Sequence, residues 1–228
     1  KLMNRTFDSE FADKIEEAIK EEQVSVALEE SVTQIETVNG RITTVHTTKG
    51  TYKADAVIIA TGFIPNTAFL DGQLDRLGNG AIKIDTYGRT SQKDIFAAGD
   101  CASIPHRLLG DVYLPLATTA NKMGRIVGIN IGGTQTQEYV GTLGSSAIKV
   151  GGYEAAATGI TEKIAVEKGL DVKTTCIEVP NHSNYYGMQE KIMIKLVYDR
   201  KTKVLYGAQL FGKNETVLRA TGLAVAIH

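Results

Sequence analysis

The chain has 228 residues, of which 43% are hydrophobic and 22% are charged, and its net charge is −1. This length accommodates one large domain or two modest ones. The balanced charge excludes a protein that binds nucleic acid without sequence preference, because such a protein needs a basic face. No apolar run approaches the roughly 20 residues of a membrane-spanning helix. The only two cysteines exclude a disulfide scaffold and a cysteine zinc cluster. We therefore expect a cytoplasmic globular protein with no nucleic acid, membrane or metal among its partners.

Both ends of the sequence predict a piece of a longer polypeptide. The chain starts at Lys1 without an initiator methionine or a signal-like segment. Its last residues, up to His228, continue an apolar helical pattern that has no Gly or Pro stop. We expect that some of the chemistry resides in the missing parts.

Residues 8–22 predict an amphipathic helix. Its apolar residues recur at every fourth position on one face, namely Phe11, Ile15 and Ile19. Asp8 or Ser9 is the expected N-cap, because a short oxygen-bearing side chain accepts a hydrogen bond from the free N–H groups of the first turn.

The next part of the chain predicts β-structure. Asn39-Gly40 lies between two β-rich runs and predicts a hairpin, because both turn residues accept a positive φ. Lys49-Gly50 marks a second turn. Short apolar segments predict further strands at 24–28, 56–60, 82–85 and 95–98. Those at 56–60 and 95–98 have the composition of strands buried on both faces, as in a layered α/β domain.

Residues 116–131 predict a second helix, after which the pattern changes. Three glycines spaced by four lie on one face of this helix, where another backbone can approach closely: Gly124, Gly128 and Gly132. A linker is expected from Gly132 to Gly141. The remaining elements indicate an α+β unit with an antiparallel sheet, made of strands at 145–157, 173–179, 191–198 and 203–211 and helices at 161–168 and from 214.

Four local motifs suit ligand binding, and each has an ordinary structural alternative. Gly99-Asp100 ends a buried strand, where α/β sheets bind ligands, although a turn or capping aspartate is the commoner role. The helix that opens after Pro115 presents free N–H groups to anions, as every helix does. Gly62 permits close approach to a ligand or simply a tight turn. Tyr185-Tyr186 offers phenols that donate protons or pack at a sheet edge. Cys101 and Cys176 are expected to be structural thiols, because neither has a CxxC partner.

Four motifs in order closely resemble those of the FAD-dependent pyridine nucleotide–disulfide oxidoreductases. The nearest branch contains coenzyme A disulfide reductase, NADH oxidase and NADH peroxidase. The motifs run from Asp55 to Thr67, from Thr90 to Cys101, from Pro115 to Arg125, and from Gly141 to Gly144. The resemblance extends over essentially the whole chain.

The resemblance implies the carboxyl-terminal half of such an enzyme. Residues 1–64 would end the NAD(H)-binding domain, 65–138 would be the returning segment of the FAD-binding domain, and 139–228 would be the dimerisation domain. The implied fold is partial α/β nucleotide-binding domains of the three-layer, parallel-sheet type, followed by an α+β domain with an antiparallel sheet. Both GxGxxG fingerprints and the redox-active cysteine would lie upstream, and a short tail would lie downstream.

The resemblance also implies site residues. Asp100, with Gly99, would hold the ribityl chain of FAD, and Leu116, Ala117 and Thr118 would face the flavin pyrimidine end. A helix N-terminus suits that place because the reduced flavin carries negative charge there. Gly62 would lie near the nicotinamide nucleotide. Tyr185-Tyr186-Gly187 resembles a Tyr-Tyr-Pro-Gly stretch from which a tyrosine reaches across the dimer toward the redox cysteine, although this chain lacks the proline.

The implied activity passes electrons from NAD(P)H through FAD to a cysteine centre and on to a disulfide such as coenzyme A disulfide. A water-forming NADH oxidase or an NADH peroxidase is the alternative within the same fold. An alternative of another class is that the 228 residues alone form a homodimer through residues 139–228 but neither retain FAD and NAD(P)H nor catalyse. The natural small-molecule acceptor, the choice between NADH and NADPH, and the acting tyrosine all stay open.

Overall fold

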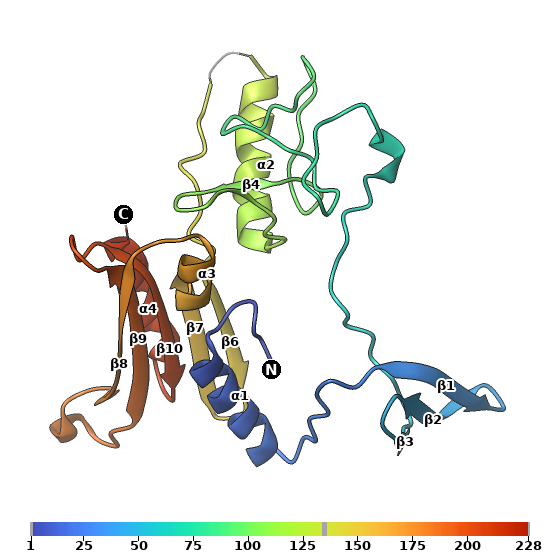
Figure 1. The fold of residues 1–228 in the computed structure, drawn as a ribbon, viewed down its shortest axis with the longest axis vertical. Helices are drawn as coiled ribbons and strands as arrows, with labels where there is room; N and C mark the ends of the chain where they lie inside the picture. Colours follow the sequence, from blue (N-terminus) through green and yellow to red (C-terminus); the bar gives the residue numbers. More distant parts are fainter. Residues whose placement is uncertain (1, 134–135, 228) are drawn as a thin grey trace.

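The computed structural model describes residues 2–133 and 136–227. Figure 1 shows a sheet-and-helix unit built from the C-terminal residues, a loop-rich unit around one long helix, and a separate hairpin. Within the described residues, none of the helices combines the length and the apolar character of a bilayer span.

A five-stranded antiparallel sheet, in the order β6-β7-β10-β9-β8, dominates the C-terminal unit. Its strands are β6 (Ser146–Val150), β7 (Tyr153–Gly159), β8 (Val172–Pro180), β9 (Lys191–Asp199) and β10 (Leu205–Gly212). Three helices accompany it: α3 (Glu162–Glu167), η2 (Asn184–Tyr186) and α4 (Thr216–Ala226). The predicted antiparallel α+β unit is therefore confirmed. The strand predicted over 145–157 is two strands, because Gly151, at φ +54°, turns the chain between them.

The two faces of this sheet bury different helices, as strand alternation requires. Ala156, Ala208 and Leu210 face α4 and pack with its Ala220. Their neighbours in sequence point the other way, where they meet α1 (Ser9–Glu21). The apolar stripe predicted for this helix is what contacts the sheet: Phe11, Ile15 and the preceding Phe7 pack on Ala155, Ala157 and Phe211. The N-terminal helix is thus docked on a sheet that begins more than a hundred residues later in the chain (Figure 1).

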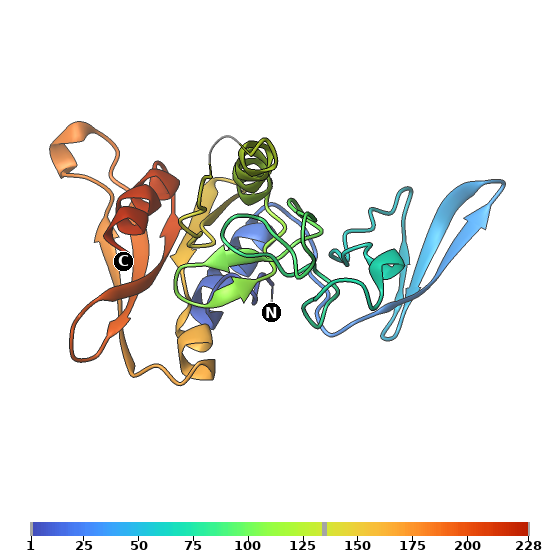
Figure 2. The same ribbon diagram turned by 90° about the horizontal axis from the view of Figure 1, so that it is seen from above.

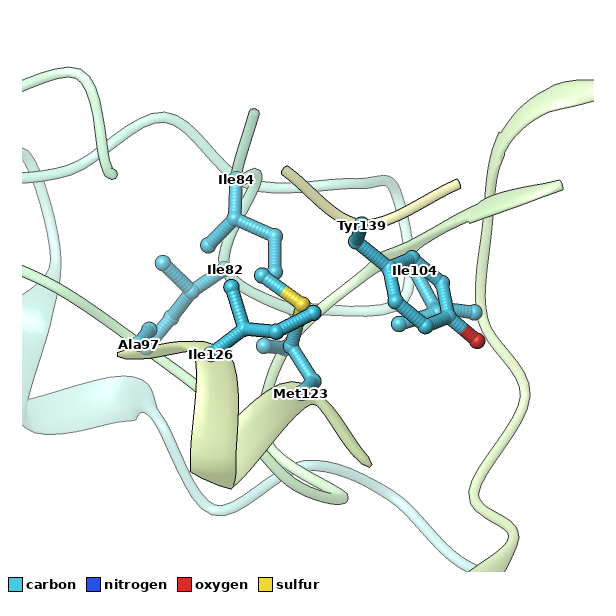
Figure 3. Packing of buried hydrophobic residues seen from close by; sticks show 8 residues of the cluster. Ile82, Ile84, Ala97, Ile104, Met123, Ile126 and Tyr139 are labelled. Atoms are coloured by element: carbon cyan, nitrogen blue, oxygen red, sulfur yellow. The ribbon is translucent and has the colours of Figure 1, made fainter. Parts of the chain in front are cut away.

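The loop-rich unit gathers around α2 (Ala117–Ile131), which confirms the second predicted helix. Its other elements are short: η1 (Ala68–Leu70), β4 (Ile104–His106) and β5 (Gly110–Val112). Figure 3 shows its core, in which Met123 and Ile126 of α2 lie against side chains from β4 and the loops, namely Ile82, Ile84, Ala97, Ile104 and Tyr139. Gly124 and Gly128 lie outside this core, and no other described atom comes within 4 Å of the position a Cβ would take, so the expected close backbone approach is not made within the described chain.

The hairpin predicted around Asn39-Gly40 is confirmed. It consists of β1 (Val32–Val38) and β2 (Arg41–Thr47), and β3 (Thr51–Lys53) adds a third strand after the turn at Gly50. Asn39 and Gly40 have φ values of 50° and 75°, as the tight turn requires. The hairpin extends away from the rest of the chain in both views (Figures 1 and 2).

The other strands expected of a parallel sheet are not formed. Residues 24–28 and 56–60 make no strand pairing, and Ile58 and Ile59 are 91% and 77% exposed. The segments 82–85 and 95–98 contribute only isolated bridges. The physical reason is that a strand apolar on both faces is stable only between neighbouring strands, and the described residues supply none. The linker expected from Gly132 to Gly141 includes residues 134–135, which lie outside the described residues.

Candidate functional site

The turn at Gly99-Asp100 presents a carboxylate to the surface. Gly99 has φ +85°, a conformation that strongly favours glycine, and it accepts the backbone N–H of Ala102 at 3.1 Å. The turn leaves Asp100 exposed. Burial, together with the charge of Asp100, raises the pKa of Tyr113, so the phenol stays protonated beside the carboxylate. The side chains at this turn are therefore an acceptor and a donor of hydrogen bonds.

The start of α2 has no side-chain cap. Leu116 occupies the N-cap position with extended dihedrals, and it has no oxygen to offer the first turn. The hydroxyl of Thr119 turns back instead and donates to the carbonyl of Leu116 at 2.8 Å. Ala117 and Thr118 are exposed. The free N–H groups and the positive end of the helix dipole are thus open to an outside acceptor.

A groove of about 350 Å³ lies beside this helix start. Arg107 and Lys122 contribute cationic side chains to its lining, which also includes Thr118 and Tyr139. None of the described residues that line it carries a carboxylate. Sequence reasoning did not single out these two cations, since nothing in the local pattern relates a residue of the β4–β5 loop to one on α2.

The expected nucleotide-side residue, Gly62, lies apart from this cluster. It has φ +101°, and no described atom comes within 4 Å of the position a Cβ would take. It belongs to the extended, exposed segment that contains Ile58 and Ile59. The turn at Asp100 and the start of α2 belong to one packed unit, whereas Gly62 stands outside it.

Tyr185 and Tyr186 form an exposed aromatic pair on η2, in the connection between β8 and β9. Their ring centroids are 4.6 Å apart, and His182 meets Tyr186 edge-on at 6.3 Å. Gly187 has φ +110° and turns the chain at the place where the resemblance leads one to expect Pro-Gly. In both views η2 lies away from α2, so this chain does not bring the tyrosines to the Asp100 turn (Figures 1 and 2).

The two cysteines differ in environment. The Cys101 thiol is half-buried and donates to the carbonyl of Ala98 at 3.4 Å. Cys176 is exposed on the edge strand β8. Partial burial, aided by the negative charge of Glu10, raises the pKa of the Cys176 thiol. A protonated thiol is a poor nucleophile, so Cys176 lacks the features of a reactive site.

Three carboxylates gather near the start of α1, at a place that sequence reasoning missed. Asp8, Glu10 and Glu162 offer oxygens within 4.8 Å of one another, a spacing that suits a cation. The ammonium group of Lys195 lies among them and contacts all three. No sequence signal could have found this cluster, because its members are separated by up to 187 residues, from 8 to 195.

Two protein-family models match most of the chain. The model of the pyridine nucleotide-disulphide oxidoreductase family matches residues 1–124, and that of the family's dimerisation domain matches residues 145–228. These matches confirm the expected fold class, a nucleotide-binding-like region followed by a dimerisation-type domain with an antiparallel sheet.

Similar sequences include an NADH oxidase of Enterococcus faecalis, 35% identical over 100% of this chain and 51% of the relative. A CoA-dependent NAD(P)H sulfur oxidoreductase of Pyrococcus furiosus is 38% identical over 93% of this chain and 48% of the relative. The chain therefore spans about half the length of the curated relatives it matches.

Solved structures agree. The water-forming NADH oxidase of Lactobacillus brevis bound to NADH gives a TM-score of 0.88 at 34% identity, covering 96% of this chain and 49% of that one. An NAD-dependent persulfide reductase from A. fulgidus gives a TM-score of 0.88 at 33% identity, covering 97% of this chain and 41% of that one. The chain belongs to the pyridine nucleotide-disulphide oxidoreductase family.

Proposed function

We propose that the longer protein containing this chain is an FAD-dependent NAD(P)H oxidoreductase of the cytoplasm. The observation that carries the proposal is the uncapped start of α2, with exposed Ala117 and Thr118, in the same packed unit as the exposed carboxylate of Asp100. FAD, when bound, would supply the redox chemistry that links the nicotinamide nucleotide to the acceptor. The residues present suit part of this cofactor, because the chain offers contacts for its ribityl and pyrimidine portions.

Each group of this site has a role that follows from its chemistry. The Asp100 carboxylate accepts hydrogen bonds from the ribityl hydroxyls, and Gly99 provides the turn that exposes it. The N–H groups of Ala117 and Thr118 donate toward the pyrimidine end, where the helix dipole would stabilise negative charge on the ring. Leu116 leads the backbone into this helix start, and its own N–H donates to the carbonyl of Leu114 at 2.9 Å. Gly62 leaves room for the nicotinamide nucleotide to approach the backbone.

The proposed acceptor is a disulfide such as coenzyme A disulfide, reduced through a cysteine centre that another part of the protein supplies. The exposed pair Tyr185 and Tyr186 supports this choice, because it lies on a protruding loop from which a phenol can reach a partner subunit and donate a proton. The second candidate is reduction of oxygen or peroxide, and it is favoured by the similarity to NADH oxidases.

We also propose that the protein is a homodimer through residues 139–228. The outer face of α4 supports this, because Leu218 and Val225 are exposed two helical turns apart while Ala220 packs on the sheet. We propose that the 228 residues alone do not bind FAD stoichiometrically and do not oxidise NADH. This follows from the absence of GxGxxG from the sequence and from the unpaired, exposed segment around Ile58 and Ile59.

The test is a steady-state comparison with the full-length protein. NADH or NADPH is supplied with coenzyme A disulfide, oxygen or peroxide as the acceptor, and consumption of each acceptor is measured. The disulfide proposal expects the highest kcat/KM with coenzyme A disulfide and a marked loss in the double variant Y185F/Y186F. Negligible disulfide turnover beside rapid oxygen consumption would overturn it in favour of the oxidase.

A further inference from the structure

Lys195 of β9 carries a buried positive charge that the proposed chemistry does not use. Its side chain is only 4% exposed, and it points to the face of the sheet that α1 covers. The ammonium lies 3.0 Å from Oδ2 of Asp8 and 2.7 Å from Oε2 of Glu162, and it also contacts Glu10. A buried ammonium is tolerated only when it is paired in this way, so the position of Asp8 is tied to that of Lys195.

Asp8 makes more contacts than a helix N-cap needs. It occupies the N-cap position of α1, yet its carboxylate does not cap that helix, contrary to the sequence expectation. The carboxylate accepts instead from the backbone N–H groups of Glu162 and Lys163, at 3.1 and 3.2 Å, and so stabilises the start of α3. One side chain thus joins the N-terminal segment to a helix 154 residues further along.

Gln209 of β10 completes the cluster with a paired hydrogen bond. Its amide nitrogen donates to Oδ2 of Asp8 at 2.6 Å, and its amide oxygen accepts the backbone N–H of Asp8 at 2.7 Å. Gln209 is 1% exposed, so its amide is shielded from bulk water. The side chains of Asp8, Lys195 and Gln209 are named here the polar lock.

The polar lock adds what the apolar contacts of α1 do not provide. Phe11 and Ile15 hold the helix on the sheet through the hydrophobic effect, which is not directional, so a small slide or rotation costs little. A slide of Asp8 would leave the buried amide of Gln209 without its partners and would take one of the three carboxylates from the buried ammonium of Lys195, which costs much more. The lock therefore selects one orientation of α1 on the sheet.

We propose that Lys195 is a positioning residue whose lock with Asp8 and Gln209 fixes the NAD(P)H-binding part of the protein on the five-stranded sheet of the dimerisation domain, here called the dimerisation sheet. The proposal rests on the proposed function, since it takes residues 1–64 as the end of the nucleotide-binding domain. α1 is the helix of those residues, and their hairpin follows it in the chain and extends outward (Figure 1). A loosened α1 leaves only a fraction of the molecules competent for the nucleotide, and the apparent affinity falls by that fraction.

The test uses the full-length holoenzyme with Lys195→Met. The control is Lys191→Met, at an exposed lysine of the same strand whose ion pair with Glu178 spans 3.3 Å. In K195M, hydrogen exchange of the α1 amides should accelerate by about a hundredfold, because one partner of a buried pair is gone. The KM for NAD(P)H should rise about tenfold with kcat within about twofold. K191M should change neither quantity beyond about twofold.

A second variant separates positioning from simple destabilisation. Asp8→Asn keeps a carbonyl oxygen for Gln209 and for α3 but removes the charge that K195M leaves unpaired. D8N/K195M should therefore recover about tenfold of the hydrogen-exchange protection that K195M loses, and its KM should return most of the way to the wild-type value. Three results would each overturn the lock. They are unchanged hydrogen exchange of α1 in K195M, a fall in kcat as large as the rise in KM, and no recovery in the double variant. If the full-length protein oxidises no NAD(P)H, the proposed function fails, while the exchange measurements still decide the lock.

Discussion

Phe11 gives the sharpest test of how α1 docks on the dimerisation sheet. Its side chain is 0% exposed and packs among Phe7, Ile15 and Phe211. A buried phenylalanine removes roughly 150–250 Å² from water, which at about 25 cal/mol per Å² amounts to roughly 4–6 kcal/mol as an upper limit. Truncation of a core phenylalanine to alanine typically costs about 3–5 kcal/mol. We therefore expect Phe11→Ala to lower the free energy of unfolding by about 3–5 kcal/mol.

The assay is urea unfolding followed by circular dichroism at one fixed protein concentration, because a dimer's stability depends on concentration. With an m-value of about 2 kcal/mol/M, the midpoint should fall by about 2 M. Phe69→Ala is the matched control, since this phenylalanine is 74% exposed, and it should shift the free energy by no more than about 0.5 kcal/mol. A change below about 1 kcal/mol in F11A would refute the packing of α1 on the sheet.

Three further predictions follow from the site and the lock. Burial acts to raise the pKa of Asp8, but hydrogen bonds of the lock outweigh it and hold that pKa below 3.8. Its stabilisation is therefore complete above about pH 3.8 and is lost as the pH falls through the folded-state pKa, so Asp8→Asn should flatten the fall of Tm with pH below about pH 4. Asp100→Ala should weaken FAD binding to the full-length protein by roughly 10- to 100-fold in a fluorescence titration, and an equal loss in the exposed control Asp111→Ala would refute a specific contact. Leu218→Asp with Val225→Asp should convert the dimer to monomers in light scattering, and an unchanged mass would show that α4 lies outside the interface.

Local signals in the sequence were sufficient for the hairpin and for the antiparallel unit. Asn39-Gly40 determines its turn through two positive φ values, which depend only on the two residues themselves. Each strand of the five-stranded sheet finds its neighbours within the residues from 146 to 212, so the pattern and the pairing lie in one stretch of sequence.

The buried strand predicted at 56–60 shows where such reasoning stops. The apolar run was identified correctly, but strand formation depends on hydrogen-bonding neighbours that the described residues do not supply, and Ile58 and Ile59 remain exposed. Asp8 does occupy the N-cap position of α1, but the side-chain cap expected of it is not formed, for a related reason. The local pattern allowed a cap on α1, whereas the fold offered this carboxylate stronger partners on α3, β9 and β10.

The candidate site was predicted as a set of positions rather than as an assembled pocket. The turn at Asp100 and the open start of α2 lie in one packed unit, while Gly62 lies in an exposed segment without strand pairing and Tyr185 and Tyr186 lie on η2. The polar lock was not predictable at all, because Asp8 and Gln209 are 201 residues apart and each has an ordinary local explanation.

The proposed function requires that the full-length protein take electrons from a nicotinamide nucleotide into bound FAD. The most direct measurement is an anaerobic titration of the purified full-length protein with NADH and NADPH, followed by the visible absorption of the flavin. We expect one FAD per chain and loss of the oxidised flavin band on addition of at least one of the two nucleotides. A colourless protein that binds no added FAD, or a flavin band that neither nucleotide alters, would contradict it.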